Sequence, residues 1–298
     1  MKKRLQYIVI LLCSFSAIAQ NDIKLNHLQC EMLTNPLGID VLQPRLSWQF
    51  QTNDAGVEQT VYQVLVASSA EKLASNQADL WDSGKVETST SVNIQYKGKS
   101  LDSKDEAYWK VKVWTNKGAS TWSETAHWSM GILTYAEWKS TRWIGYNQLF
   151  PGDSVGQFSK LSARYIRKQI DLKKNIKKAT VYIMGMGLYE FYVNGEKIGN
   201  QVLAPVPTDY TKNVKYNVFD VTSNLMQGEN VLGTILGNGR FFAMRQEYKP
   251  YKIKSFGFPK MALQLVVEYE DGTKETIKTD QTWKFSPNGP IRANNEYD

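Results

Sequence analysis

Hydrophobic and polar residues alternate with a period of two through much of the first half of the chain. Over residues 61–67, the side chains of Tyr62, Val64 and Val66 fall on one face, as in a strand with one buried side. A second run, over residues 108–114, separates apolar residues from lysines in the same way. The two sets are Trp109, Val111 and Val113 on one side and Lys110 and Lys112 on the other. Such runs favour an antiparallel β-sandwich.

Short turns and one Trp-Ser pair indicate which sandwich to expect. The turns are at Ser83-Gly84, Lys97-Gly98 and Lys117-Gly118. The pair Trp122-Ser123 after the last turn resembles fibronectin type III domains. We expect a fibronectin type III-like sandwich over residues 20–145. Residues 146–162 are interrupted by Asn, Pro, Gly, Asp and Ser and are predicted to form a linker.

The alternation resumes after the linker. Residues 166–172 and 261–269 each carry an apolar face. Asn194-Gly195 follows a strand-like run, and this pair is a strong hairpin signal because both residues tolerate a positive φ. Helix is expected only over residues 70–78 and in one turn at 222–228. The sequence therefore predicts an all-β chain of two β-sandwich domains, the second over residues 163–298.

The first twenty residues have the composition of a secretory signal peptide. Lys2, Lys3 and Arg4 precede an apolar run from Tyr7 to Cys13, and Ala17-Ile18-Ala19 precedes Gln20. The apolar run is much shorter than the roughly 20 residues that span a bilayer. We expect a signal peptide over residues 1–19, no membrane span, and a secreted, periplasmic or cell-surface protein.

Charge and aromatic content refine this picture. The 16 Tyr and 9 Trp residues favour strands. The formal charge of +7, from 36 cations and 29 anions, falls to 33 minus 29, or +4, without Lys2, Lys3 and Arg4. The remaining cations are scattered along the chain, which argues against a nucleic-acid partner.

The sequence offers no motif for a metal or a cofactor. Its two histidines, His27 and His127, have no second ligand at metal-binding spacing. Gly98-Lys99-Ser100 resembles the end of a phosphate loop, but Asn93 stands where the first glycine is required. Gly185-Met186-Gly187 lacks the third glycine of a dinucleotide fingerprint. We expect no cofactor and no metal.

Seven sequence blocks follow one another in a characteristic order in the first half. They are LQCE at 28–31, NPLGID at 35–40, PRLSW at 44–48, QTVYQVLVAS at 59–68, LWDSGKV at 80–86, YWKVKVW at 108–114 and WIG at 143–145. Together they resemble the opening of bacterial, Bacteroidetes-like α-L-rhamnosidases, which are glycoside hydrolases.

The second half carries further blocks of the same family. They are GLYEFYVNG at 187–195, PTDY at 207–210, DVT at 220–222 and GEN at 228–230. These blocks resemble the family's jelly-roll N-terminal domain, which is similar to sugar-binding modules of other glycosidases. The family's helical-barrel catalytic domain, with an Arg-Asp-Glu-Arg signature and two catalytic glutamates, has no counterpart before Asp298. We therefore expect a truncated chain with no catalytic residue.

Two predicted loops of the second domain combine aromatic and polar residues. Sugar recognition needs an apolar surface for the ring and planar polar groups for its hydroxyls. The candidates are Asp209, Tyr210, Asn238, Arg240 and Phe241. Because Arg240 stands where the family usually has an aromatic residue, any stacking role passes to Phe241 or is lost. The alternative is turn chemistry, with Asp209 as a cap and Asn238 supplying a positive φ.

The resemblance implies the non-catalytic N-terminal region of an exported α-L-rhamnosidase. The full-length enzyme would hydrolyse terminal α-L-rhamnose from a rhamnose-containing glycan or glycoside by inversion, with one glutamate as acid and another as base. The 298 residues alone are expected to be inactive. The alternative is a free-standing secreted carbohydrate-binding or adhesion protein of two β-sandwiches. A reading frame that continues beyond Asp298 would favour the enzyme, and a stop codon there would favour the alternative.

Overall fold

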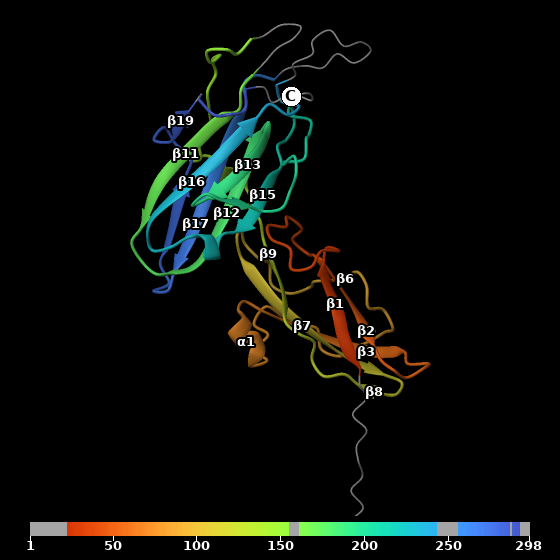
Figure 1. Ribbon diagram of the computed structural model, residues 1–298. Coiled ribbons are helices and arrows are strands. Elements are labelled where there is room, and N and C mark those ends of the chain that lie inside the picture. The colour runs from red at the N-terminus through yellow and green to blue at the C-terminus, as the bar shows by residue number, and fades with distance from the viewer. Residues whose placement is uncertain (1–22, 155–160, 243–255, 287, 293–298) are drawn as a thin grey trace, which may run out of the picture. The chain divides into compact units, whose positions relative to one another are not determined.

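Strands dominate the protein, as the sequence predicts. The computed structural model describes residues 23–154, 161–242, 256–286 and 288–292 (Figure 1), so the predicted signal peptide lies outside the described residues. One short helix, α1 (Ala70–Ala74), and the 3₁₀ turns η1 (Tyr135–Trp138) and η2 (Thr222–Asn224) accompany the sheets. The chain forms two compact units. Unit 1 ends at Trp128, and unit 2 begins at Ser129 and also includes residues 37–40 and 102–105.

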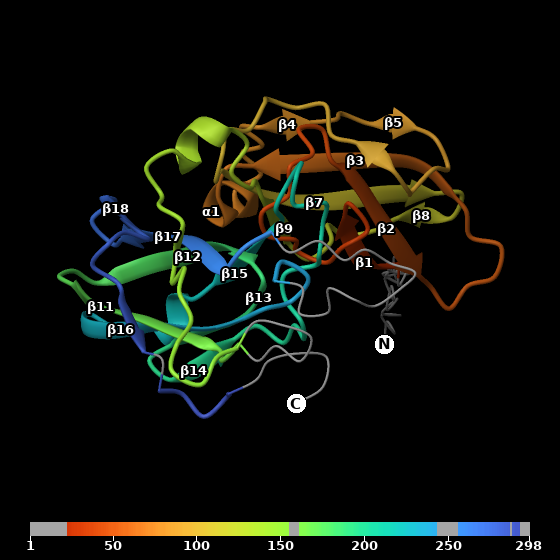
Figure 2. The ribbon, with the colours of Figure 1, turned by 90° about the horizontal axis from the view of Figure 1, so that it is seen from above.

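Unit 1 contains two sheets. The smaller sheet has the order β1-β2-β6 and consists of β1 (Lys24–Cys30), β2 (Arg45–Gln51) and β6 (Ile94–Gln95). The larger sheet is centred on the antiparallel pair β3 (Gln59–Ala67) and β7 (Glu106–Thr115), which run side by side in Figure 2. Its other strands are β4 (Trp81–Asp82), β5 (Val86–Glu87), β8 (Gly118–Ala119) and β9 (Ala126–Ser129).

The core of unit 1 follows the predicted alternation. Tyr62, Val64 and Val66 of β3 and Trp109, Val111 and Val113 of β7 are all buried. The buried Trp48 of β2 packs edge-on against Tyr62, with ring centroids 5.1 Å apart. Its indole Nε1 donates to Oε1 of buried Gln59 at 3.0 Å, which satisfies a polar group that would be costly to bury alone.

Lys110 differs from the sequence expectation. The alternation places it with Lys112 on the side of the strand opposite Trp109, yet only 8% of its surface is exposed. Its Nζ donates to the carbonyl oxygen of Leu73 in α1 at 2.8 Å and lies 5.2 Å from the centre of the Trp122 ring. Burial lowers the pKa of Lys110. Helix α1, which ends at Ala74 rather than at residue 78, supplies this contact.

Unit 2 is a sandwich of two five-stranded sheets. One has the order β10-β17-β12-β15, with β18 paired to β17, and the other has the order β14-β13-β16-β11-β19. The first sheet consists of β10 (Ile144–Gly145), β17 (Lys260–Tyr269), β12 (Ile176–Met186), β15 (Tyr216–Asp220) and β18 (Lys274–Lys278). The second consists of β14 (Glu196–Ile198), β13 (Leu188–Val193), β16 (Gly228–Gly237), β11 (Arg164–Leu172) and β19 (Lys284–Ser286).

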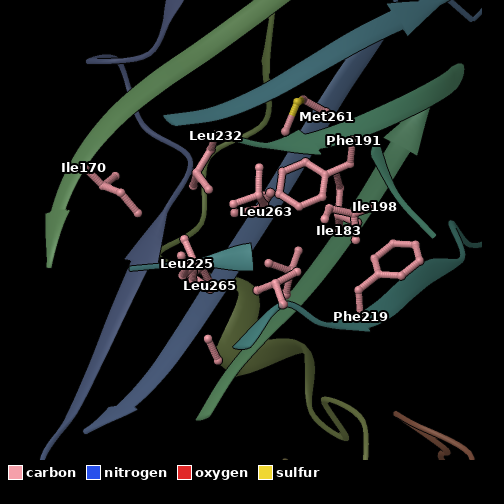
Figure 3. Close-up of a cluster of buried hydrophobic side chains, with 14 of the residues drawn as sticks. Ile170, Ile183, Phe191, Ile198, Phe219, Leu225, Leu232, Met261, Leu263 and Leu265 are labelled. Atoms are coloured by element: carbon pink, nitrogen blue, oxygen red, sulfur yellow. The ribbon is translucent and has the colours of Figure 1, made fainter. Parts of the chain in front are cut away.

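The core of unit 2 lies between its sheets. The predicted apolar face of β17 is buried, since Met261, Leu263 and Leu265 are 0% exposed. They belong to one cluster with Phe191 of β13 and Leu232 of β16, strands of the opposite sheet (Figure 3). Two sheets with period-two strands thus share one apolar interior.

The predicted hairpin at Asn194-Gly195 is confirmed. Val193 of β13 pairs with Glu196 of β14, and Asn194 and Gly195 have φ angles of 51° and 88°. Positive φ at both central residues is the requirement of a type I′ turn. Oδ1 of Asn194 also accepts a hydrogen bond from N of Val231 at 2.8 Å, so the turn is attached to β16.

The two units divide earlier than the expected first-domain end at residue 145. Ile144 of β10 pairs with Met261 of β17, which places this segment in unit 2. The expected linker at 146–162 also includes Asp153, which forms a buried ion pair with Arg164 of β11. Sequence patterning missed both contacts because they join residues far apart along the chain or in loops.

Candidate functional site

The five predicted sugar-binding residues lie in two segments of unit 2. Asp209 and Tyr210 belong to the connection between β14 and β15. Asn238, Arg240 and Phe241 directly follow β16. The structure brings the two aromatic residues together, whereas the polar residues have different surroundings.

Asp209 organises its own turn. Its Oδ1 accepts hydrogen bonds from N and Oγ1 of Thr211 at 3.1 and 2.6 Å. The hydroxyl and backbone hydrogen bonds from Thr211, with help from Lys212, hold the pKa of Asp209 below its usual range. This carboxylate therefore has the turn role that was its alternative interpretation.

The same Asp-x-Thr turn recurs in unit 2. In each case Oδ1 of the aspartate accepts from both N and Oγ1 of the threonine two residues later. The pairs are Asp209 with Thr211, Asp220 with Thr222, Asp271 with Thr273, and Asp280 with Thr282. The motif is visible in the sequence, so the turn role of Asp209 was detectable there.

Tyr210 and Phe241 meet in an aromatic cluster with Phe256. The Tyr210 ring packs edge-on against Phe241, with centroids 5.2 Å apart, and against Phe256 at 5.5 Å. Phe241 and Phe256 are stacked at 5.8 Å, and N of Phe256 donates to the carbonyl oxygen of Phe241 at 2.9 Å. Phe241 is 5% exposed. The predicted stacking residue is therefore mostly covered by other side chains.

Asn238 and Arg240 face different environments. Asn238 is 2% exposed, whereas Arg240 is exposed. The positive φ in this bend belongs to Gly239, at 49°, and not to Asn238. A Cβ on Gly239 would lie 2.9 Å from Cγ of Leu188. Gly239 therefore supplies the positive φ that the sequence pattern assigns to Asn238, and it also avoids a clash with Leu188.

Metal-ligating groups do not gather in the described part of the chain. Residues 23–154, 161–242, 256–286 and 288–292 contain no group of three or more His, Cys, Asp and Glu side chains placed to hold a metal ion. Cys30 is a buried free thiol, and burial raises its pKa to about 12. No helix among these residues has the length and apolarity needed to cross a membrane.

A groove that contains none of the five predicted site residues lies on the outer face of the β14-β13-β16-β11-β19 sheet. It has a volume of about 300 Å³, and its lining includes Arg167, Tyr192, Gly233 and Lys284. The available sequence signal was Gly233, a glycine inside the strand run 228–237. Glycine in a strand interior marks a place where something approaches the backbone closely.

The fold defines the class of protein: two β-sandwich domains that follow each other along the chain. A family model matches each of the two domains. The model described as "Rha78A-like, N-terminal immunoglobulin domain" matches residues 25–134. The model described as "Alpha-L-rhamnosidase N-terminal domain" matches residues 174–298. The two domains of the chain therefore match the N-terminal portion of α-L-rhamnosidases.

Similar proteins extend well beyond the length of this chain. An α-L-rhamnosidase of Formosa agariphila is 38% identical over 281 residues, which cover 89% of this chain and 29% of that protein. The structure of α-L-rhamnosidase from Dictyoglumus thermophilum matches 92% of this chain with a TM-score of 0.79 and 40% identity. The Aspergillus terreus enzyme matches 91% with a TM-score of 0.78 and 28% identity. The chain covers 30% of each of these two structures.

Proposed function

We propose that this chain is the non-catalytic N-terminal region of an exported α-L-rhamnosidase. The whole enzyme hydrolyses terminal α-L-rhamnose from a rhamnose-containing glycan or glycoside, and residues outside this chain supply its acid and base. One observation carries the proposal. Both sandwiches match N-terminal family models, while the chain spans only 29% of the first curated relative.

The reading frame and the stereochemistry of the product test this proposal. The transcript is sequenced beyond the codon for Asp298, and the protein of the complete frame is purified and given an aryl α-L-rhamnoside. We expect an open frame of several hundred further codons and release of β-L-rhamnose, observed by proton NMR before mutarotation. Inversion requires two carboxyl groups about 6.5–9.5 Å apart, with room for a water molecule. A stop codon at this point would instead favour a free-standing carbohydrate-binding or adhesion protein.

Export is a further part of the proposal, and it rests on the sequence of residues 1–19. Cleavage after Ala19 leaves Gln20 as the first residue, because small residues occupy the positions before it. We predict that mass spectrometry of protein recovered from the periplasm or cell surface finds this terminus. An intact Met1 on the exported protein would contradict both the cleavage site and the signal-peptide assignment.

The loop residues remain our proposal for a neutral-sugar contact. The adjacency of Tyr210 and Phe241 supports it, and exposed Arg240 adds a planar donor group. The turn bonds of Asp209 favour the structural alternative. Isothermal titration with L-rhamnose is made on wild type and on a variant carrying Asn238→Ala and Arg240→Ala. Loss of heat in the variant supports a loop site, and equal heats leave these residues with a role in the turn.

A further inference from the structure

The outer face of the β14-β13-β16-β11-β19 sheet carries a groove with a floor and two charged side chains. In β16 the residues Leu232, Thr234 and Leu236 point into the core and are buried. Val231, Gly233 and Ile235 therefore face outward, because side chains alternate along a strand. All three outward residues line the groove.

Gly233 forms the floor of this groove. Its neighbours in register are Tyr192 of β13 and Arg167 of β11. A Cβ added at Gly233 would meet only Cβ of Tyr192, at the ordinary contact distance of 3.7 Å. Packing of the protein itself therefore does not require glycine here, and glycine weakens a strand. Its effect is an open space between the two flanking side chains.

The Tyr192 ring forms one wall of the groove, and a hydrogen bond holds it in place. Its hydroxyl donates to Oε2 of Glu190 at 2.6 Å, and Glu190 also forms an ion pair with Lys197. The carboxylate nearest to this wall is thus already neutralised by a lysine. Val231 and Ile235 extend the apolar surface on either side of Gly233. A flat ring with an apolar face fits such a surface.

Two cations stand next to this apolar surface. Arg167 of β11 lies directly opposite Lys284 of β19 in register, and both side chains are exposed. Among the described residues, neither cation has an ion-pair partner. Like charges directly opposite each other destabilise a sheet. Two further acidic residues of the same face, Asp171 and Glu229, lie opposite each other in register at the far end of the strands.

We propose that this groove binds a carboxylate-bearing sugar chain, such as a uronic-acid oligosaccharide. The sugar ring lies over Gly233 against Tyr192, Val231 and Ile235, while its carboxylate is bound by Arg167 and Lys284. Arginine matches the two oxygens of a carboxylate, and lysine adds a second positive charge. The volume of about 300 Å³ is at the lower end for small-molecule sites. This inference goes beyond the proposed function and does not depend on rhamnose hydrolysis.

Isothermal titration of the chain with a tetragalacturonate tests the proposal. The methyl-esterified tetrasaccharide is the neutral control, and poly-L-glutamate is the control for a merely anionic partner. We expect heat with the acidic sugar only, and an affinity that falls as salt is raised, because exposed charges are screened. Equal binding of the methyl ester, equal binding of polyglutamate, or no heat at millimolar tetragalacturonate would each overturn the proposal.

Two variants assign the binding to the groove. Gly233→Leu fills the floor and should abolish binding without loss of thermal stability, because leucine is better than glycine in a strand. Arg167→Gln with Lys284→Gln should weaken binding about tenfold or more. Arg142→Gln with Lys215→Gln removes the same charge from exposed positions outside the groove lining and should bind as wild type does. Wild-type affinity in both groove variants would contradict the assignment.

Measurement of the oligomeric state tests whether a second copy of the chain occupies the groove. Sedimentation of wild type and Gly233→Leu at the titration concentration should give the same mass. A dimer present only in wild type would show that the groove is an interface between two copies, and it would overturn the sugar assignment.

Discussion

At the scale of single residues, the buried charge of Arg164 is compensated by several neighbouring groups. Its side chain is 0% exposed, and the guanidinium lies 3.2 Å from the carboxylate of Asp153, which is 1% exposed. The same guanidinium donates to the carbonyl oxygens of Ser162 and Gln148 and lies 4.6 Å from the centre of the Phe150 ring. A buried ion pair tolerates the loss of one partner poorly, because the other charge is then left uncompensated.

Removal of the Asp153 charge should therefore be costly. We predict that Asp153→Asn lowers the free energy of unfolding by about 3–5 kcal/mol, measured by urea denaturation. Asp209→Asn is the matched control, because Asp209 is exposed and an asparagine oxygen can accept the same turn bonds from Thr211. The control should unfold as wild type does. Equal midpoints for wild type and Asp153→Asn would refute a stabilising role for the pair.

The Asp153 carboxylate makes the stability of the fold depend on pH. Burial alone would raise the pKa of Asp153, but hydrogen bonds from Ser162 and Phe150 and the charge of Arg164 hold it below its usual range. A depressed carboxyl pKa stabilises the fold at a pH above the unfolded value of about 4, and this stability is lost as the pH falls through the folded value. We predict a steeper loss of stability below about pH 4 in wild type than in Asp153→Asn. Parallel pH profiles would contradict this.

Residue roles were only partly predictable from sequence. The turn at Asp209 has a local signature, Asp-x-Thr, which repeats at Asp220, Asp271 and Asp280. Burial of Arg164 and Lys110 has no such signature, because their partners lie in a loop and in a short helix. Asn238 was assigned a positive φ that the structure gives to Gly239, since a Gly-Asn-Gly sequence does not specify which residue bends.

At the scale of elements, two glycines of the second sheet have opposite reasons to be present. Gly195 has a φ of 88° in the hairpin turn, with no atom within 4 Å of an added Cβ, so its constraint is conformational. Gly233 lies within β16 without a positive φ, so neither backbone strain nor a clash requires it. The glycine at 195 serves the fold, and that at 233 leaves room on the outer face.

These two positions make a matched test. Gly195→Ala should cost about 1–2 kcal/mol of unfolding free energy, because a side chain disfavours the left-handed region. Gly233→Ala should be neutral or more stable by about 0.5 kcal/mol, because alanine loses less backbone entropy in a strand. Urea denaturation of both variants measures the difference. A larger loss at 233 than at 195 would show that the groove floor is structurally constrained.

The strands were more predictable from the sequence than the boundary between the two units. The alternation located β3, β7, β11 and β17, because each buries one face and exposes part of the other. Strand β10 has only two residues, and its partner β17 is more than one hundred residues away in sequence. No local pattern identifies such a pairing, so the sequence placed the end of the first domain too late.

At the scale of the whole molecule, each unit has a hydrophobic core of its own. Unit 1 buries Trp48, Trp109 and Trp128, and unit 2 buries the cluster that includes Phe191 and Leu263. Both units match N-terminal domains of α-L-rhamnosidases. The all-β fold and the family were therefore accessible from sequence, because several blocks occur in the family's order.

The central claim is that these 298 residues are the non-catalytic part of a rhamnosidase. Its most direct test is the rate at which the purified chain releases aryl alcohol from a chromogenic α-L-rhamnoside, beside equimolar protein from the complete reading frame. We predict that the 298-residue chain does not exceed the solvent blank and that the longer protein turns over. Turnover by the 298-residue chain that persists at constant specific activity through repurification would contradict the account.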